Sequence, residues 1–251
     1  MKGSHGLTAD LNYTLSRAQG NASDAGAFAE SWTTLWNQDP YNLKNLTDQV
    51  DSWNHTHEVK GYLVYDLPFG HGKRLATGRH AIDEYLLGGW TLGTELSYHS
   101  GAPLWTVAAA NQYPGWDAVF AMRNSNVSLS NHFKTLNLAW VADPVGTDPS
   151  SVYFDPAAYS NPAFGAFSPE KYSIQDSLRD WAWASEDISM VKRFSFGRDG
   201  RFQATLRAQF FDAFNRHHWS APNTDINSPF FGHVTGVSGH RYGQIGARFE
   251  W

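Results

Sequence analysis

The sequence predicts an all-β fold: about six antiparallel strands of an up-and-down transmembrane β-barrel. We expect an incomplete barrel, a barrel segment with long extracellular loops and short periplasmic turns. The clearest strand is 242–251, where apolar residues recur at every second position from Ile245 to Trp251. The opposite face carries Arg248 and Glu250, so it requires water, whereas the apolar face ends on an indole suited to lipid headgroups. This combination is typical of a strand between lipid and an aqueous lumen.

The composition supports the same fold class. Charged residues make up 17% of the chain and aromatic residues 15%, a balance that fits the aromatic girdles of a barrel better than a soluble core. The mean hydropathy is -0.46 and no run of 18 apolar residues occurs, so a helical membrane protein is excluded. A net charge of -5 argues against nucleic acid as a partner. Cysteine is absent, which excludes disulfides and thiolate chemistry.

Five further segments alternate in the same way. Each is about ten residues long, which is the length that a tilted strand needs to cross a bilayer. The fourth of the six strands is the weakest, because Lys192 shares a face with Met190 and Phe194. Either this lysine extends to the headgroups near the periplasmic turn, or the face of this strand is assigned wrongly. The five predicted segments are 7–16, 57–67, 90–100, 183–196 and 202–215.

The connections alternate between short and long. Asp199 and Gly200 predict a tight hairpin, in which a three-residue loop pairs Phe196 with Phe202 and keeps both apolar faces on one side. The connection 68–89 is of moderate length, and three others are long. Short turns on one side and long loops on the other are typical of outer-membrane barrels, so the short side is expected to be periplasmic. The long connections are 17–53, 101–182 and 216–240.

Several motifs occur in the same order as in a known family. Five stretches resemble the C-terminal barrel of Oar-like TonB-dependent outer-membrane transporters: VYDLPFGHGKRL, LLGGWTLGTELSYHSGAPL, YFDPAAYSNPAFGAF, FFDAFNRHHWSAPNTDINSPFFG and IGARFEW. The stretch GLTADLNYTLSRA resembles a strand further upstream in the same barrels. The resemblance covers most of the chain, and residues 106–151 match least. It implies a 22-stranded barrel with an N-terminal plug and a motif that engages TonB.

The chain departs from that pattern in its extent. It contains neither a plug nor a TonB-engaging segment, Met1 runs into a strand without a signal peptide, and only six strands are predicted. Because the smallest transmembrane barrels have eight strands, we expect residues 1–251 to be the C-terminal portion, a fragment, of a receptor barrel. Its expected partners are outer-membrane lipid, the remaining strands and plug of the parent chain, and TonB through the missing N-terminal part. The barrel assembly machinery is expected to recognise the strand that ends at Trp251.

Polar side chains on the predicted lumen face are candidates for ligand binding. If Leu67 pairs with Trp90, the register places Glu58 opposite His99 and Lys60 opposite Ser97. One interpretation is contact with substrate or plug, or a metal near the Glu58–His99 pair with His57 beside it. The plainer interpretation, which we favour, is that these side chains are polar because the lumen face contacts water. We expect no metal or other cofactor. The lumen candidates are Glu58, Lys60, Glu95, His99, Arg207 and Gln209.

Tryptophans in the long loops are the second group of candidates. Trp105 and Trp116 are the ligand-binding candidates among them, because aromatic platforms stack on sugar rings or hydrophobic ligands. The plainer interpretation is that such residues fasten the long loops to one another.

No catalytic arrangement is present in the sequence. It has no Ser-His-Asp set, phosphate loop or metal-binding helix motif, so we expect no enzymatic activity. The leading hypothesis is the wall and extracellular loops of a TonB-dependent receptor in the bacterial outer membrane, importing an unidentified substrate. Two alternatives from other classes are a stand-alone oligomeric outer-membrane protein or adhesin, and a soluble carbohydrate-binding β-sandwich.

Overall fold

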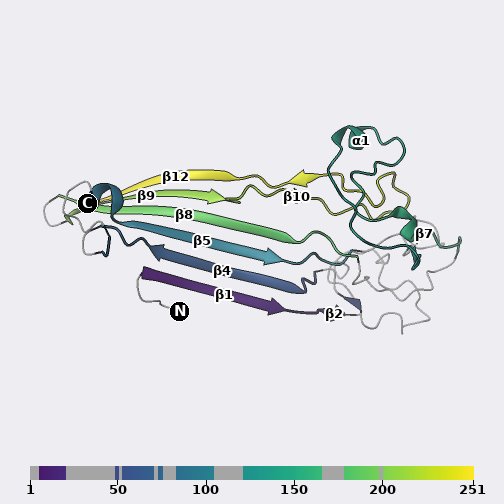
Figure 1. Cartoon of the computed structure of the whole chain (residues 1–251), viewed down its shortest axis with the longest axis horizontal. Coiled ribbons are helices and arrows are strands. Elements are labelled where there is room, and N and C mark those ends of the chain that lie inside the picture. The colour runs from purple at the N-terminus through teal and green to yellow at the C-terminus, as the bar shows by residue number, and fades with distance from the viewer. Residues whose placement is uncertain are drawn as a thin grey trace, which may run out of the picture.

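Six long strands form one antiparallel sheet in the computed structural model, in the order β1-β4-β5-β8-β9-β12. Each strand pairs with the next long strand in the chain, which is the predicted up-and-down arrangement (Figure 1). The strands are β1 (Leu7–Leu15), β4 (His57–Asp66), β5 (Trp90–His99), β8 (Trp183–Phe196), β9 (Phe202–Phe211) and β12 (Tyr242–Glu250). The structure describes residues 6–20, 49–50, 53–70, 73–75, 83–104, 121–165, 178–197 and 200–251.

The remaining elements are short and lie in the connections. A π-helical turn, η4 (Asp83–Leu87), lies between β4 and β5, and a 3-10 turn, η5 (Pro156–Ala158), and α1 (Leu138–Ala142) follow β5. Among the described residues no helix is both long and apolar enough to cross a membrane. The two-residue strands are β2 (Gln19–Gly20), β3 (Gln49–Val50), β6 (Met122–Arg123), β7 (Tyr159–Ser160), β10 (His218–Trp219) and β11 (Val237–Ser238), paired as β2–β3, β6–β7 and β10–β11.

The strand register agrees with the predicted pairings. Phe196 pairs with Phe202 across the β8–β9 hairpin, where Gly200 has a positive φ of 67°. The N–H of Leu67 donates to the carbonyl of Trp90 at 2.9 Å, and Lys60 lies opposite Ser97. These pairings place the apolar positions of all six strands on one face of the sheet and the polar positions on the other.

The end of β9 was predicted incorrectly. The strand ends at Phe211 and not at Asn215, because Asp212 and Asn215 have positive φ angles of 47° and 54°. The N–H of Asn215 donates to the carbonyl of Asp212 at 2.8 Å, which closes a tight turn directly after the strand. The other strand bounds differ from the predicted ones by one residue at most.

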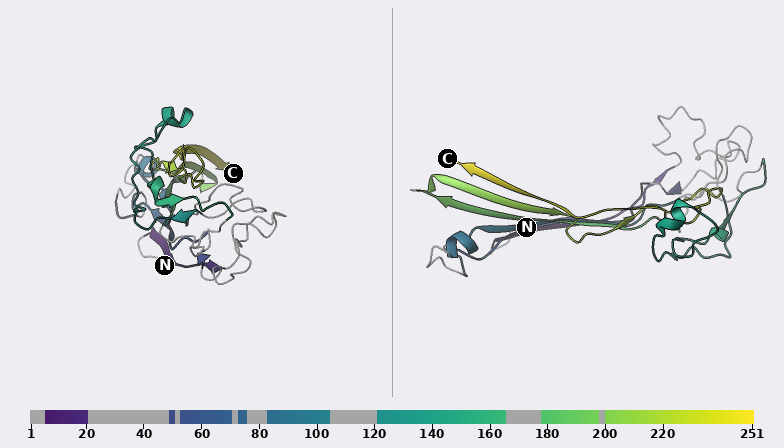
Figure 2. Two further views of the ribbon diagram at one scale, coloured as in Figure 1. Left: turned by 90° about the vertical axis from the view of Figure 1, so that its right-hand side faces the viewer. Right: turned by 90° about the horizontal axis from the view of Figure 1, so that it is seen from above.

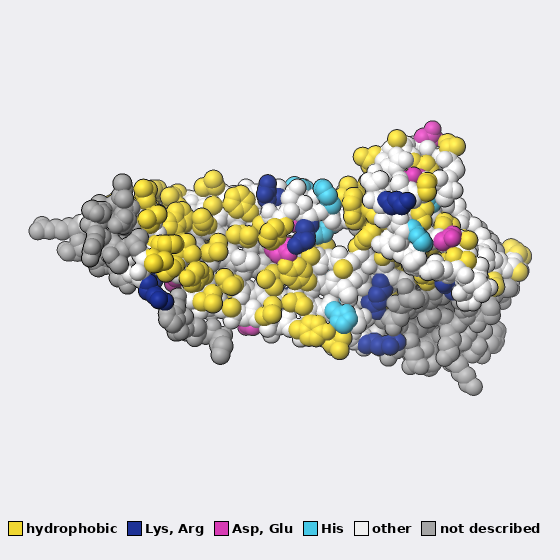
Figure 3. Space-filling model, viewed as in Figure 1, with side chains coloured by type: hydrophobic (Ala, Val, Ile, Leu, Met, Phe, Trp, Pro, Cys, Tyr) yellow, Lys and Arg dark blue, Asp and Glu magenta, His cyan; other side chains and the backbone are white. Residues whose placement is uncertain are grey.

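The apolar face of the sheet carries almost no cover of its own. Hydrophobic side chains spread over the six strands on the face shown in Figure 3, and exposed fractions reach 87% for Ile245 and 68% for Leu11. Of the described sheet residues on this face, Ala204 is the only apolar one that is fully buried. An apolar face of this extent is typical of a barrel wall that contacts lipid.

Lys192 lies on the apolar face as its period predicts, opposite Trp90 and Leu206. Its ammonium group is buried rather than exposed at the surface. Its side chain is 3% exposed, its ammonium donates to the carbonyl of Gly88, and its Nζ lies 5.5 Å from the centre of the Trp90 ring. The predicted face of this strand is therefore correct, and the connection between β4 and β5 shields the charge at the periplasmic end of the sheet.

The hydrophobic core lies outside the sheet, in the extracellular connections. We name residues 121–165, 178–182 and 212–241 the extracellular cap; it forms the right-hand end of the molecule in Figure 1 and the right panel of Figure 2. Its aromatic rings meet edge to face, with centroids 5.3 Å apart for Phe154 and Phe231. The buried members are Ala121, Tyr153, Phe154, Ala158, Tyr159, Leu178, Phe231 and Val234.

The sheet has two open edges in the described structure. β1 and β12 are its outermost strands, and each pairs on one side only. β1 begins and β12 ends at the short-turn, periplasmic end of the sheet (Figure 1). A single sheet with an uncovered apolar face does not support the alternative of a soluble β-sandwich, which needs a second sheet packed against that face.

Candidate functional site

The predicted lumen residues share the polar face of the sheet. Glu58 lies directly opposite His99, and Glu95 lies opposite Asp187 on the next strand. Because side chains alternate along a strand, all of these positions point away from the lipid-facing side. On β9 the face continues with Arg207 and Gln209, opposite Val191 and Ser189 of β8.

Two adjoining hollows bring most of these candidates together. One, of about 390 Å³, is lined by Asn12, Lys60, Tyr62, Glu95 and Ser97, with Gly61 and Leu96. The other, of about 230 Å³, shares Tyr62 and Glu95 with the first, and Asp187, Arg207 and Gln209 also line it. Glu58 and His99 lie beyond these hollows, at the extracellular ends of β4 and β5.

The charges on this face are only partly paired. Lys60 forms an ion pair with Glu58, and Arg248 pairs with Glu250 at 2.7 Å. Arg193 and Arg207 have no ion-pair partner among the residues that the structure describes. The wall of β8 and β9 thus offers free guanidinium groups to the lumen. Such groups can bind anionic solutes or an acidic protein surface.

Four aromatic rings form a row at the extracellular rim of the polar face, which we name the rim row. The ring centroids of His55 and His99 are 4.0 Å apart, those of His99 and Trp183 are 5.5 Å apart, and those of Trp183 and His218 are 5.2 Å apart. Both His55 and His99 place Nδ1 against the carbonyl of Ser100, at 2.7 and 3.1 Å. Because a carbonyl only accepts, Nδ1 is the protonated nitrogen of both rings.

The prediction that His57 lies near the Glu58–His99 pair is wrong. His57 points to the opposite face, where its Nδ1 lies 2.9 Å from the hydroxyl of Tyr13. It is His55, before the strand begins, that meets His99. Within the described residues no group of three His, Cys, Asp or Glu side chains is close enough to hold a metal ion.

A third hollow, of about 160 Å³, lies between the rim row and the extracellular cap. Asp180 lines it, with three tryptophans and three histidines. Burial raises the pKa of the Asp180 carboxyl above its usual range, although the N–H of Trp181 donates to its Oδ1 at 2.7 Å and lowers the pKa. The indole rings and imidazoles supply flat apolar surface, and the carboxyl supplies a hydrogen-bonding group. The other lining residues are His99, Trp181, Ala182, Trp183, His217, His218 and Trp219.

The tryptophans of the long loops were predicted either to bind ligand or to fasten the loops to one another. Trp105 and Trp116 lie outside the described residues. Trp140 is buried in the extracellular cap, where its ring packs 5.5 Å from Phe230 and 4.6 Å from His233. Trp140 therefore fastens α1 to the rest of the cap, as the plainer interpretation expected, whereas Trp53 is 71% exposed.

A polar cluster on the apolar face was missed in the sequence. Glu186 is 4% exposed and accepts hydrogen bonds from the Tyr98 hydroxyl and from two nitrogens of Arg216. The carboxylate raises the pKa of Arg216. The sequence did contain a signal for this cluster. Glu186 lies two positions before Ile188 and therefore on the same face of the strand, and an arginine follows the end of β9.

Comparison with known protein families decides the class. A family model described as outer membrane beta barrel domain matches residues 2–244. The chain belongs to this family. An outer membrane beta barrel domain fits the alternating strands, the uncovered apolar face and the uneven connections, and it locates the protein in the bacterial outer membrane. No curated protein and no solved structure matches the chain.

Proposed function

We propose that this outer membrane beta barrel domain forms part of the wall and the extracellular loops of a TonB-dependent receptor that imports a solute. The substrate is unidentified. The observation that carries the proposal is the open six-stranded sheet, which is too narrow to close into a transmembrane barrel of eight or more strands. Unpaired backbone groups in lipid cost several kcal/mol each, so both edges require further strands.

The positions of the family-like motifs support the same proposal. The stretch 153–167 contributes Tyr153, Phe154 and Tyr159 to the buried core of the extracellular cap. The stretch 210–232 contains the turn after β9 and contributes Phe231 to that core. The motifs therefore build a packed cap above the lumen wall, which suits a receptor that admits solutes selectively.

The proposal includes the partners that the sequence led us to expect. Outer-membrane lipid covers the apolar face, and the remaining strands and plug of a parent chain complete the barrel. TonB binds through the N-terminal part of that parent, and the assembly machinery recognises β12 and Trp251. The free arginines on the lumen wall provide contacts for the plug or for the solute. This role includes no enzymatic step and no nucleic acid.

The size of the native polypeptide tests the proposal. An antibody against the 216–240 loop is used to blot outer membranes of the source cells. We expect a band several times larger than 28.1 kDa, and extracted protein of that size should bind the periplasmic part of TonB.

Two outcomes would contradict the proposal in different ways. A band at 28.1 kDa in the membrane favours the stand-alone oligomeric barrel or adhesin, whose six-stranded sheets join edge to edge. A large band that does not bind TonB keeps the wide barrel and overturns the TonB-dependent role.

A further inference from the structure

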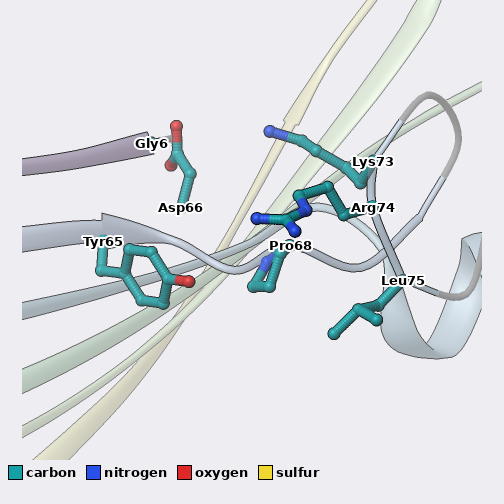
Figure 4. Close-up of a pocket in the computed structure, with 7 residues that line it drawn as sticks. All are labelled: Gly6, Tyr65, Asp66, Pro68, Lys73, Arg74 and Leu75. Atoms are coloured by element: carbon teal, nitrogen blue, oxygen red, sulfur yellow. The ribbon is translucent and has the colours of Figure 1, made fainter. Parts of the chain in front are cut away.

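A hollow lies at the periplasmic end of the sheet. It measures about 540 Å³, within the range of about 300–1,000 Å³ found for small-molecule sites. It is formed by the start of β1, the end of β4 and the connection that follows β4 (Figure 4). Its lining residues are Gly6, Tyr65, Asp66, Pro68, Lys73, Arg74 and Leu75.

Opposite charges face each other across this hollow. The amino group of Lys73 and the guanidinium of Arg74 point toward the side where Asp66 and Tyr65 lie (Figure 4). Asp66 accepts a hydrogen bond from the Thr91 hydroxyl at 2.7 Å. In the described part of the chain, none of Asp66, Lys73 and Arg74 forms an ion pair. Both signs of charge are therefore available to one ligand.

The backbone holds the two cations in place. The N–H of Leu75 donates to the carbonyl of Pro68 at 2.9 Å, and the N–H of Gly70 donates back to Leu75 at 3.2 Å. The N–H of Lys73 donates to Gly70 at 3.0 Å. These bonds flank both cationic residues and fix the backbone from which their side chains project, so a ligand does not have to order this backbone.

The hollow lies at the level of lipid headgroups. Asp66 is the last residue of β4, and Pro68, Lys73, Arg74 and Leu75 follow it, so the hollow lies just beyond the periplasmic end of this strand. The same connection exposes Tyr85, Leu86 and Leu87, which are 53%, 62% and 47% exposed. A tyrosine among leucines at a sheet end is typical of a membrane interface, here that of the periplasmic leaflet.

We propose that this hollow binds the headgroup of an aminophospholipid of the periplasmic leaflet. The phosphate lies against Lys73 and Arg74, the primary ammonium lies against Asp66, and Leu75 contacts the apolar part of the lipid. A purely anionic headgroup leaves Asp66 unpaired and repels it. A choline headgroup carries no N–H to donate to the carboxylate. The charge pattern therefore selects phosphatidylethanolamine over phosphatidylglycerol and phosphatidylcholine.

The test measures lipid binding to the native protein. Protein extracted from outer membranes in mild detergent is stripped of lipid and titrated separately with phosphatidylethanolamine, phosphatidylglycerol and phosphatidylcholine, and bound lipid is counted by native mass spectrometry. We expect phosphatidylethanolamine to bind at least about tenfold more tightly than the other two, and K73A/R74A to weaken its binding by at least about tenfold. D66N should remove the preference over phosphatidylglycerol.

The controls separate this site from general lipid contact. Arg201 lies in the β8–β9 turn with its guanidinium 5.8 Å from the centre of the Phe202 ring, so R201A should leave lipid binding unchanged. Lys73 and Arg74 are exposed, and a circular dichroism spectrum shows whether K73A/R74A keeps its strands. Equal binding of the three lipids, or binding that K73A/R74A does not weaken, would overturn the proposal. Displacement of the lipid by inorganic phosphate at millimolar concentration would reassign the hollow to a free anion.

Discussion

Arg216 holds Glu186 with two hydrogen bonds, from Nε to Oε2 at 2.9 Å and from Nη2 to Oε1 at 2.7 Å. This bidentate pair joins the chain that leaves β9 to the extracellular end of β8. The carbonyl of Glu186 also accepts the N–H of Ala213 at 2.8 Å, so the pair secures the base of the extracellular cap.

Replacement of Arg216 should loosen this junction. R216A leaves the buried Glu186 carboxylate without its counter-charge, and we expect thermal unfolding in detergent to occur several degrees lower. R216K keeps the charge but loses the planar bidentate geometry, so its unfolding temperature should lie in between. The double variant R216A/E186Q should recover part of the loss. If R216A unfolds at the wild-type temperature, the pair does not secure the cap.

The two residues Lys192 and Met190 give a matched test of the lipid-facing side. Lys192 is near the interface and shielded by Gly88 and Trp90, so K192M should change the unfolding free energy by less than about 1 kcal/mol. Met190 lies two positions further into the sheet and is 39% exposed, so M190K should destabilise the protein by about 2–4 kcal/mol. Urea unfolding in lipid vesicles measures both. Equal costs for the two variants would show that this face is not in lipid.

Gly89 is expected to tolerate no side chain. Its φ is +70°, and a Cβ atom there would overlap the carbonyl oxygen of Arg193 on β8. G89A should therefore cost at least about 2 kcal/mol and disturb the periplasmic end of the β5–β8 pairing. The control is G246A in β12, where a Cβ atom meets open space, so its effect should stay within about 0.5 kcal/mol. The same urea series compares them, and a harmless G89A would contradict the close approach of these strands.

The extracellular cap should open at alkaline pH. Burial, with a smaller contribution from the charge of Asp180, raises the pKa of Tyr153 from 10.0 to about 12. Because the folded state holds this proton more tightly than the unfolded state, Tyr153 favours the folded cap at neutral pH. That contribution is lost as the pH rises from 10 to about 12.

Near-ultraviolet circular dichroism follows this opening through Trp181, whose ring centroid lies 4.8 Å from that of Tyr153. Y153F removes both the ionisable hydroxyl and its 2.7 Å hydrogen bond to the carbonyl of Arg179. The variant should lose the part of the alkaline transition that Tyr153 causes, and tyrosinate absorbance shows which residue ionises. A transition of unchanged size and position in Y153F would rule out this residue as the cause.

The strands of the barrel wall were predictable because the two-residue alternation of apolar and polar side chains determines which face each residue occupies and which strand register is allowed. The pairing of Phe196 with Phe202 followed from the requirement that both apolar faces coincide, and the pairing of Leu67 with Trp90 then placed Glu58 opposite His99. Local turn chemistry at Gly200 was enough to select the hairpin. Each of these inferences uses neighbours in sequence or strands joined by a single short or moderate connection.

The features that sequence analysis missed depend on contacts between distant segments, which the alternation of side chains along a strand does not predict. Glu186 meets Arg216 only because Asp212 and Asn215 turn the chain after β9. Lys192 is shielded by a connection that folds back from between two other strands. The cap core joins segments such as Phe154 and Val234, which are far apart in sequence, and no periodic pattern predicts their meeting.

The location of the buried cluster affects how the protein can diverge in evolution. Extracellular loops are ordinarily the segments in which homologues vary most. Here Phe154 and Val234 are fully enclosed in the extracellular cap, whereas Ile245 and Leu11 are exposed on the apolar face of the wall. Any apolar side chain satisfies lipid, but an enclosed position accepts few shapes. Homologues should therefore drift freely along the wall while the residues that enclose these two positions stay the same.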